Sequence, residues 1–166
     1  MSWIAILMGS ASDWPIMQGT TEVLERLGVD YEVKITSAHR TPQATMDYVV
    51  DAQARGAAAF ICAAGMAAHL AGAVAARTIR PVIGVPIDSG PLSGFDALLS
   101  TVQMPGGIPV ATVAVGKSGA KNAAYLAAQI LAVSDATVAE KLRADRHDNG
   151  AKVQAQNERL QNELGS

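Results

Sequence analysis

Short apolar runs rich in β-branched residues alternate along this chain with longer segments that carry helical spacing of apolar residues. The pattern predicts five strands, at Trp3–Met8, Tyr31–Thr36, Ala58–Ala63, Val82–Val85 and Val110–Val115. It predicts five helices, at Trp14–Leu27, Pro42–Arg55, Ala68–Arg77, Leu92–Ser100 and Ala120–Val133. Such alternation is typical of a doubly wound α/β fold, in which right-handed crossovers lay helices on a parallel sheet. We therefore expect one α/β domain over residues 1–134.

The composition indicates how the protein assembles and which partners and locations do not fit it. Hydrophobic residues make up 49% of the chain and charged residues 17%, which leaves little polar surface for a monomer of this size. Burying apolar surface between subunits resolves this, so we predict a homo-oligomer. A net charge of −2 without a basic stripe argues against nucleic acid as a partner. No membrane span and no signal peptide is predicted, and we expect a cytoplasmic protein.

Residues 135–166 differ in kind from the rest. Charges of both signs are frequent there, and the apolar residues are sparse: Val138, Leu142, Val153, Leu160 and Leu164. One interpretation is a C-terminal extension of one or two narrow amphipathic helices that lie on a neighbouring subunit. The other is a solvated, partly frayed tail.

Ligands of open α/β sheets bind beyond the carboxyl ends of the strands, where four polar or glycine-containing segments of this chain should meet. The first is Gly9–Asp13, which follows the first predicted strand. Ser10 and Ser12 offer hydroxyls, the following helix offers free N–H groups to an anion, and Asp13 suits sugar hydroxyls. The alternative is that Ser12 or Asp13 only caps the helix.

The second segment, Ser37–Pro42, places a histidine next to an arginine after the second strand. Arg40 suits a phosphate or carboxylate, and His39 can exchange a proton near neutral pH. Thr41 and Pro42 are typical of the N-cap and first position of a helix. The alternative is that His39 is hydrogen-bonded into a turn.

The third segment, Ala63–Gly72, has small residues that let the backbone approach a planar ligand. His69 within it is predicted to be a neutral hydrogen-bonding group rather than a second acid. The fourth, Pro86–Gly94, is a polar loop long enough to cover the site. Whether Asp88 or Ser89 in this loop touches a substrate stays open.

The sequence lacks the motifs of several other kinds of binding and catalytic site. Gly116-Lys117-Ser118 resembles the end of a P-loop, but Ala111 stands where the first glycine is required. The first strand is not followed by G-x-G-x-x-G, and the chain has no G-x-S-x-G elbow. His39 and His69 lack a convincing third metal ligand. Cys62 lies in an apolar run and is interpreted as a buried hydrophobic residue. We expect neither a metal nor an organic cofactor.

Taken together, the motifs closely resemble those of the class I N5-carboxyaminoimidazole ribonucleotide mutases. The resemblance covers about residues 3–133 and rests on an ordered set of segments: Gly9-Ser10-Ala11-Ser12-Asp13-Trp14, Ser37-Ala38-His39-Arg40-Thr41-Pro42, Ala67-Ala68-His69-Leu70, Gly84-Val85-Pro86 and Val102-Gln103-Met104-Pro105-Gly106-Gly107-Ile108-Pro109. Each segment alone is a weak signal, whereas the set is specific.

The resemblance implies a flavodoxin-like three-layer domain assembled as an octamer. It implies conversion of N5-carboxyaminoimidazole ribonucleotide to 4-carboxy-5-aminoimidazole ribonucleotide in purine biosynthesis, by decarboxylation and recarboxylation. It also implies that His39 is the general acid/base and that Ser10, Asp13 and Arg40 bind the ribonucleotide. Further pocket residues follow from the same resemblance: Ser12, Ser37, Ala64, Gly65, His69 and Leu70.

Two positions depart from the family pattern, which usually reads Gly-Gly-Ala-Ala-His-Leu-Pro-Gly around the second histidine. Met66 replaces the second glycine and Ala71 replaces the proline. Met66 adds bulk where the backbone approaches the carboxylate. Two alternatives stay open: a class II carboxylase that takes free CO2, in which Lys typically replaces Arg40, and a ribonucleotide-binding module without catalysis.

Overall fold

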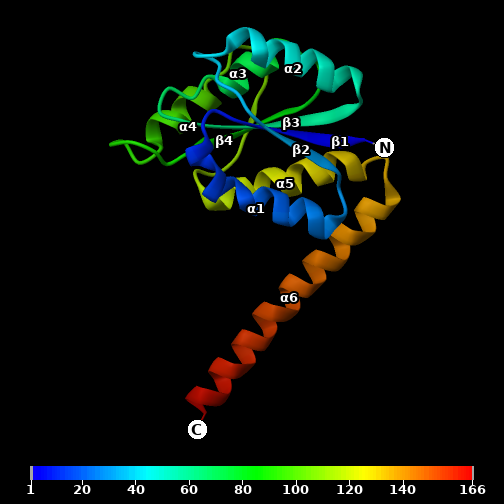
Figure 1. Ribbon diagram of the computed structural model, residues 1–166. Coiled ribbons are helices and arrows are strands. Elements are labelled where there is room, and N and C mark those ends of the chain that lie inside the picture. The colour runs from blue at the N-terminus through cyan, green and yellow to red at the C-terminus, as the bar shows by residue number, and fades with distance from the viewer. Residues whose placement is uncertain (1, 166) are drawn as a thin grey trace.

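A computed structural model describes residues 2–165 and contains one five-stranded parallel sheet with helices on both faces (Figure 1). The strand order is β2-β1-β3-β4-β5, so the chain starts inside the sheet, adds one edge, and returns to build the other side. This is the flavodoxin-like order, and it confirms the doubly wound α/β prediction. The strands are β1 (Trp3–Met8), β2 (Tyr31–Ile35), β3 (Ala57–Gly65), β4 (Val82–Ile87) and β5 (Ala111–Thr112).

The helices form the two outer layers. Helices α1 and α5 cover one face of the sheet, and α2, α3 and α4 lie on the other (Figure 1). A short 3-10 turn, η1, leads into α1. The bounds are η1 (Ala11–Asp13), α1 (Trp14–Leu27), α2 (Pro42–Ala54), α3 (Leu70–Ala75), α4 (Phe95–Val102), α5 (Lys117–Ala132) and α6 (Ala136–Leu164).

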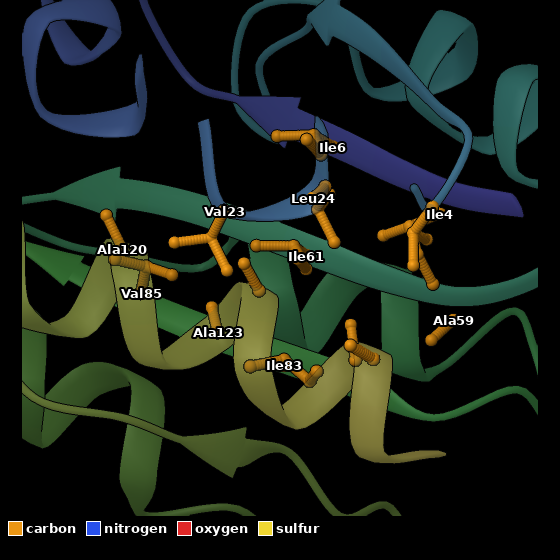
Figure 2. Packing of buried hydrophobic residues seen from close by; sticks show 14 of the residues in the cluster. Ile4, Ile6, Val23, Leu24, Ala59, Ile61, Ile83, Val85, Ala120 and Ala123 are labelled. Carbon is orange, nitrogen blue, oxygen red and sulfur yellow. The ribbon is translucent and has the colours of Figure 1, made fainter. Parts of the chain in front are cut away.

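The inner strands β1, β3 and β4 are buried on both faces, because helices cover the side chains that point to each side of the sheet. In β1, Ile4 and Ile6 point into the core beneath α1 and α5, whereas Ala5 and Leu7 point into the core beneath α2 and α3. Figure 2 shows side chains of α1 and α5 meeting those of β1, β3 and β4 in the first core. The inner strands therefore read as continuous apolar runs in the sequence.

Helix α5 packs on the sheet through small side chains. Its buried face consists largely of Gly119 and five alanines: Ala120, Ala123, Ala124, Ala127 and Ala128. Figure 2 shows Ala120 and Ala123 on the side of α5 that faces the strands. Small residues let the two backbones approach closely, which explains how a chain with few aromatic residues fills its core.

Two element boundaries near the predicted site differ from the sequence prediction. Strand β5 is in regular register with β4 only at Ala111 and Thr112. The N–H groups of Val113 and Gly116 still bond to the carbonyls of Gly84 and Pro86, but outside the regular register. Helix α3 begins at Leu70 rather than Ala68. The N–H groups of Ala68 and His69 bond to carbonyls two residues earlier, which is not a helical pattern. His69 therefore occupies the N-cap position of α3.

Helix α4 starts at Phe95 rather than Leu92, since Ser93 and Gly94 both have left-handed backbones, with φ of 51° and 82°. Helix α5 starts at Lys117, three residues earlier than predicted. The remaining boundaries agree with the prediction to within two residues.

The C-terminal segment is one continuous helix, α6, that projects away from the sheet (Figure 1). Asp135 caps it by accepting the N–H groups of Thr137 and Val138. The helix buries only Val138 and Leu142 against the domain, and residues 146–165 are exposed. The segment is helical, as the first interpretation expected, and its outer part is solvated in the single chain, as the second expected. The placement of α6 on a neighbouring subunit stays a prediction.

A polar cluster fixes the direction in which α6 leaves the domain. The carboxylate of Asp145 accepts hydrogen bonds from Arg26 Nε at 2.7 Å and from the Tyr125 hydroxyl at 2.6 Å. Asn149 Nδ2 donates a third bond at 3.0 Å. The Tyr125 and Arg26 hydrogen bonds lower the pKa of Asp145. The cluster joins α1, α5 and α6.

None of the helices in the described part of the chain combines the length and apolar character needed to cross a bilayer.

The close contact between α5 and the segment that leads into it predicts a large effect at Gly119. A Cβ at this position would overlap the Ala114 carbonyl oxygen, a backbone atom that cannot move aside easily. We expect Gly119→Ala to lower the free energy of unfolding by about 1–3 kcal/mol in urea titrations. Gly150→Ala is the matched control, since a Cβ in that part of α6 meets nothing within 4 Å. An equally stable Gly119→Ala variant would contradict the packing described here.

Candidate active site

One cleft lies at the carboxyl ends of the strands and encloses about 480 Å³. The structure brings all ten sequence-predicted residues to its wall: Ser10, Ser12, Asp13, Ser37, His39, Arg40, Ala64, Gly65, His69 and Leu70. Five further residues line it: Gly9, Ala38, Met66, Ala67 and Ser89. Of these, Met66 was expected near the carboxylate and Ser89 was left open by the sequence. The site thus lies where the topology of a doubly wound sheet places it.

The wall after β1 is a capped 3-10 turn. Ser10 Oγ accepts the backbone N–H of Ser12 and lies 2.9 Å from the Ser12 hydroxyl. The Asp13 carboxylate accepts the backbone N–H of Ser10 at 3.2 Å and completes a capping box. The alternative interpretation, in which Ser12 or Asp13 only caps the helix, is wrong: Ser10 caps the 3-10 turn, and Asp13 stands at the N-cap position of α1 without a side-chain cap hydrogen bond. Asp13 also lines the cleft, so its bond to Ser10 is compatible with ligand binding.

Asp13 is buried, with only 5% of its surface exposed. Burial raises the pKa of its carboxyl group, and the hydrogen bond from Ser10 opposes part of this effect. A carboxylate held in this way has poor access to water and suits hydroxyl donors from a ligand.

The wall after β2 is a turn built by hydroxyl groups. The Thr41 hydroxyl accepts the Ser37 N–H at 2.9 Å, and the Ser37 hydroxyl accepts the Arg40 N–H at 3.1 Å. Thr36 Oγ1 lies 2.7 Å from Thr45 Oγ1 beneath the turn. Thr41 occupies the predicted N-cap position of α2, but its hydroxyl bonds to Ser37 instead of capping the helix. This network presents His39 and Arg40 to the cleft.

Arg40 carries the positive charge of the cleft. Its guanidinium lies 3.5 Å from the Gly9 carbonyl oxygen, so it reaches back toward the turn after β1. None of the ion pairs formed within residues 2–165 involves Arg40. The charge is available to an anionic ligand.

The two cleft histidines contact each other. His39 Nε2 lies 2.6 Å from His69 Nδ1, and the rings meet edge to face with centroids 4.8 Å apart. One of these two nitrogens must carry the hydrogen and the other must accept it, so the tautomers of the two rings are coupled. Sequence reasoning placed both residues near the site, but no pattern in the chain indicated this contact.

The loop after β4 packs on the turn after β3. A Cβ at Gly65 would overlap the Ser89 hydroxyl, and a Cβ at Gly90 would lie 3.4 Å from Met66 Cγ. Ser89 therefore belongs to the cleft. Asp88 does not line it and packs beside Gly116 instead. The Gln103–Pro109 segment, part of the family-like pattern, also contributes no residue to the cleft of this chain as described over residues 2–165.

The groups in the cleft define its chemistry. It holds one guanidinium, one buried carboxylate, two hydrogen-bonded imidazoles and a largely alanine and glycine floor. Within residues 2–165 no group of three His, Cys, Asp or Glu side chains is arranged to hold a metal ion. The fold and cleft define a flavodoxin-like α/β protein whose cleft combines a positive charge outside any ion pair of the described residues with groups that can transfer a proton.

Comparison with known proteins assigns the chain to a family within this fold class. The sequence model of the AIR carboxylase family matches residues 3–152. The N5-carboxyaminoimidazole ribonucleotide mutase of Bacillus subtilis is 49% identical over 157 residues, covering 95% of this chain and 97% of that protein. The mutase of Saccharolobus solfataricus is 51% identical, covering 89% and 92%. This chain therefore belongs to the AIR carboxylase family.

Solved structures agree with this placement. The crystal structure of Treponema denticola PurE has a TM-score of 0.87 and 30% sequence identity, and the match covers 96% of this chain and 99% of that one. The crystal structure of a single-site variant of PurE2 from the same organism gives a TM-score of 0.88 at 29% identity, with the same coverage of both chains.

The buried carboxylate generates a prediction about stability. Because the pKa of Asp13 is higher in the folded protein, its ionised form disfavours folding at neutral pH, and this cost disappears once the pH falls below the ordinary value of about 3.9. The amide oxygen that Asp13→Asn introduces can still accept the Ser10 N–H. We expect Asp13→Asn to be at least as stable as the wild type at pH 7, with any gain vanishing below about pH 4.

Urea titrations at several pH values measure this difference. A variant less stable than the wild type by about 1 kcal/mol at pH 7 would mean that the charged hydrogen bond outweighs burial.

Proposed function

We propose that this chain interconverts N5-carboxyaminoimidazole ribonucleotide and 4-carboxy-5-aminoimidazole ribonucleotide in purine biosynthesis. The observation that carries the proposal is the imidazole pair of His39 and His69 in a cleft that also holds Arg40 and Asp13. Curated relatives about half identical to this chain over nearly its whole length carry the name of this mutase activity.

Binding of the ribonucleotide follows from the charges of the cleft. The guanidinium of Arg40 suits the phosphate, and the buried carboxylate of Asp13 accepts hydrogen bonds from ribose hydroxyls. Ser10 adds a hydroxyl on the same wall. The remaining predicted contacts are pocket-lining groups: Ser12, Ser37, Ala64, Gly65, His69 and Leu70.

The carboxyl group moves in two steps. The bond between the amino nitrogen and the carboxylate breaks, the electron pair stays on nitrogen, and CO2 is released beside an electron-rich imidazole. The ring carbon then attacks CO2 and loses its proton. Holding CO2 next to the ring makes its capture effectively unimolecular, an advantage that reaches an effective molarity of about 10⁵ M or more in well-oriented systems.

The net reaction needs one proton delivered to the amino nitrogen and one removed from the ring carbon. His39 performs both transfers in sequence as general acid and general base. The hydrogen bond to His69 orients the His39 ring and sets which of its nitrogens carries hydrogen. Backbone groups around Gly65 hold the migrating carboxylate. The chemistry of these two steps requires no redox partner.

Replacing the acid/base group tests its role. We expect His39→Asn to lose about 10² or more in turnover, the usual size of general acid/base catalysis, while ribonucleotide binding is retained. Turnover is followed by ultraviolet absorbance and binding by calorimetry. Near-normal turnover would refute the role of His39, whereas loss of binding would assign it to the substrate pocket instead.

Substrate comparison tests the reaction itself. The purified protein is supplied either with N5-carboxyaminoimidazole ribonucleotide or with aminoimidazole ribonucleotide plus bicarbonate. Faster formation of the 4-carboxy product from the first substrate supports the class I mutase, for which Arg40 is typical. Preference for the second mixture would favour the class II carboxylase, and no product from either would leave the binding-module alternative.

We also propose that the protein works as a cytoplasmic homo-oligomer, with the octamer that the family resemblance implies. The support is an apolar stripe on and before α4, formed by Leu92, Phe95, Leu99 and Val102, which are all exposed in the single chain. Phe95 alone leaves 65% of its surface exposed. The exposed half of α6 adds further apolar residues, including Val153 and Leu160.

Sedimentation tests the assembly. The wild type should sediment as an oligomer at micromolar concentration, and Phe95→Ser should dissociate because it removes apolar area from the stripe. Ile79→Ser is the matched control, since Ile79 is even more exposed than Phe95 but lies outside the stripe. A wild-type monomer would overturn the proposal.

A further inference from the structure

Thr36 and Thr45 are buried threonines beneath the turn that carries His39. Thr36 directly follows β2, and Thr45 belongs to α2. Their hydroxyl oxygens lie 2.7 Å apart. Burying two hydroxyl groups costs free energy that two apolar side chains would not cost, unless each hydroxyl finds hydrogen-bond partners. The direction of each hydrogen bond follows from the other contacts of these hydroxyls.

The hydroxyls of Thr36, Thr41 and Thr45 form a directional ring. The Thr45 hydroxyl donates its single hydrogen to the Thr41 carbonyl at 3.0 Å, so the hydrogen in the 2.7 Å contact comes from Thr36. The Thr36 oxygen is then left to accept, and the Thr41 hydroxyl lies 3.3 Å from it. The Thr41 hydrogen is shared with the Ser37 carbonyl at 3.2 Å. The ring therefore starts at the Thr41 side chain and returns to the Thr41 backbone.

This ring joins the two ends of the segment 37–40, which includes His39. At one end, the Thr36 N–H bonds to the Met8 carbonyl of β1 at 2.9 Å, so Thr36 is anchored to the sheet. At the other end, the Thr41 hydroxyl accepts the Ser37 N–H, and the Thr41 N–H bonds to the Ser37 carbonyl, both at 2.9 Å. Loss of the Thr36 hydroxyl is therefore transmitted through Thr41 to the backbone of the turn.

The position of the His39 ring has little tolerance. Its Nε2 atom lies 2.6 Å from His69 Nδ1, on a loop that follows a different strand. Hydrogen bonds of N–H groups extend to about 3.2 Å between heavy atoms, so a displacement of roughly 1 Å breaks this contact. Misplacing a reacting group by about 1 Å costs up to about 10²-fold in rate. Arg40, on the same turn, has a longer side chain with more rotamers and can follow a small shift of its backbone.

We propose that Thr36 is a positioning residue for proton transfer, because its hydroxyl, through the ring with Thr45 and Thr41, holds His39 within hydrogen-bonding distance of His69. The inference rests on the proposed mutase reaction. Thr36 lies beneath the turn rather than in the wall of the cleft, so it acts only through the turn. Turnover should then depend on the hydroxyl group at position 36 and not on the volume of the side chain.

Two substitutions at Thr36 separate its hydroxyl from its methyl group. Thr36→Val keeps the shape and removes the hydroxyl, and we expect kcat to fall about tenfold while KM changes by less than about threefold. Thr36→Ser keeps the hydroxyl and removes a buried methyl group. It should unfold at a lower urea concentration than the wild type and still retain at least about half of its kcat. Turnover of N5-carboxyaminoimidazole ribonucleotide is followed by ultraviolet absorbance.

Thr20→Val is the matched control. Thr20 is also buried, and its hydroxyl donates to the Ala120 carbonyl at 2.8 Å, which joins α1 to α5 away from the cleft. We expect this variant to unfold at a lower urea concentration with kcat within about twofold of the wild type. Thr45→Val breaks the ring at its α2 member and should lower kcat as Thr36→Val does. It provides the same test if Thr36→Val does not fold.

The variants separate the possible outcomes. Wild-type kcat in Thr36→Val and Thr45→Val overturns the inference. An equal loss of kcat in Thr36→Val and Thr36→Ser also overturns it, because the effect then belongs to packing. The same holds for an equal loss in Thr20→Val, or for a rise in KM at unchanged kcat. A wild type that forms no 4-carboxy product from this substrate overturns the proposed function instead.

Discussion

The rest of this molecule depends on one constraint: the carboxyl ends of the inner strands are held in fixed positions, because these strands are buried on both faces. Strands β1, β3 and β4 are held between two layers of helices, so their ends are fixed relative to one another. Each crossover must leave the sheet at this edge, and each therefore delivers its loop to the same place. The cleft therefore forms without a cavity in the core, because its walls are the loops that the topology brings to this edge.

The location of the site could be predicted from the sequence for the same reason. Predicted strands, each followed by polar or glycine residues, suffice to place Ser10, His39 and Gly65 on one edge. The geometry within the site could not be predicted. It depends on the Thr36 and Thr41 hydroxyls, and threonine in a loop carries no signal for its partner. The hydrogen bond between His39 and His69 joins loops 30 residues apart and needs the fold to be known.

The boundaries that differed from the prediction share a physical cause. Strand β5 is shorter than its apolar run because regular pairing with β4 ends after Thr112, although the N–H groups of Val113 and Gly116 still bond to β4 carbonyls. Helix α3 begins later than its apolar pattern because the turn after Gly65 follows the loop after β4 rather than the helical register. The sequence predicted a narrow apolar stripe in α6. Whether such a stripe is buried depends on the surface that packs against it, which the sequence of the helix does not show. Local propensity decides less than tertiary contact in each case.

The short hydrogen bond between the two imidazoles gives a hydrogen on the His39 ring two routes out of the cleft. In the proposed reaction, the hydrogen taken from the ring carbon can pass directly to the next substrate. It can also pass through this bond to the His69 ring, which is exposed, and reach water without either side chain turning.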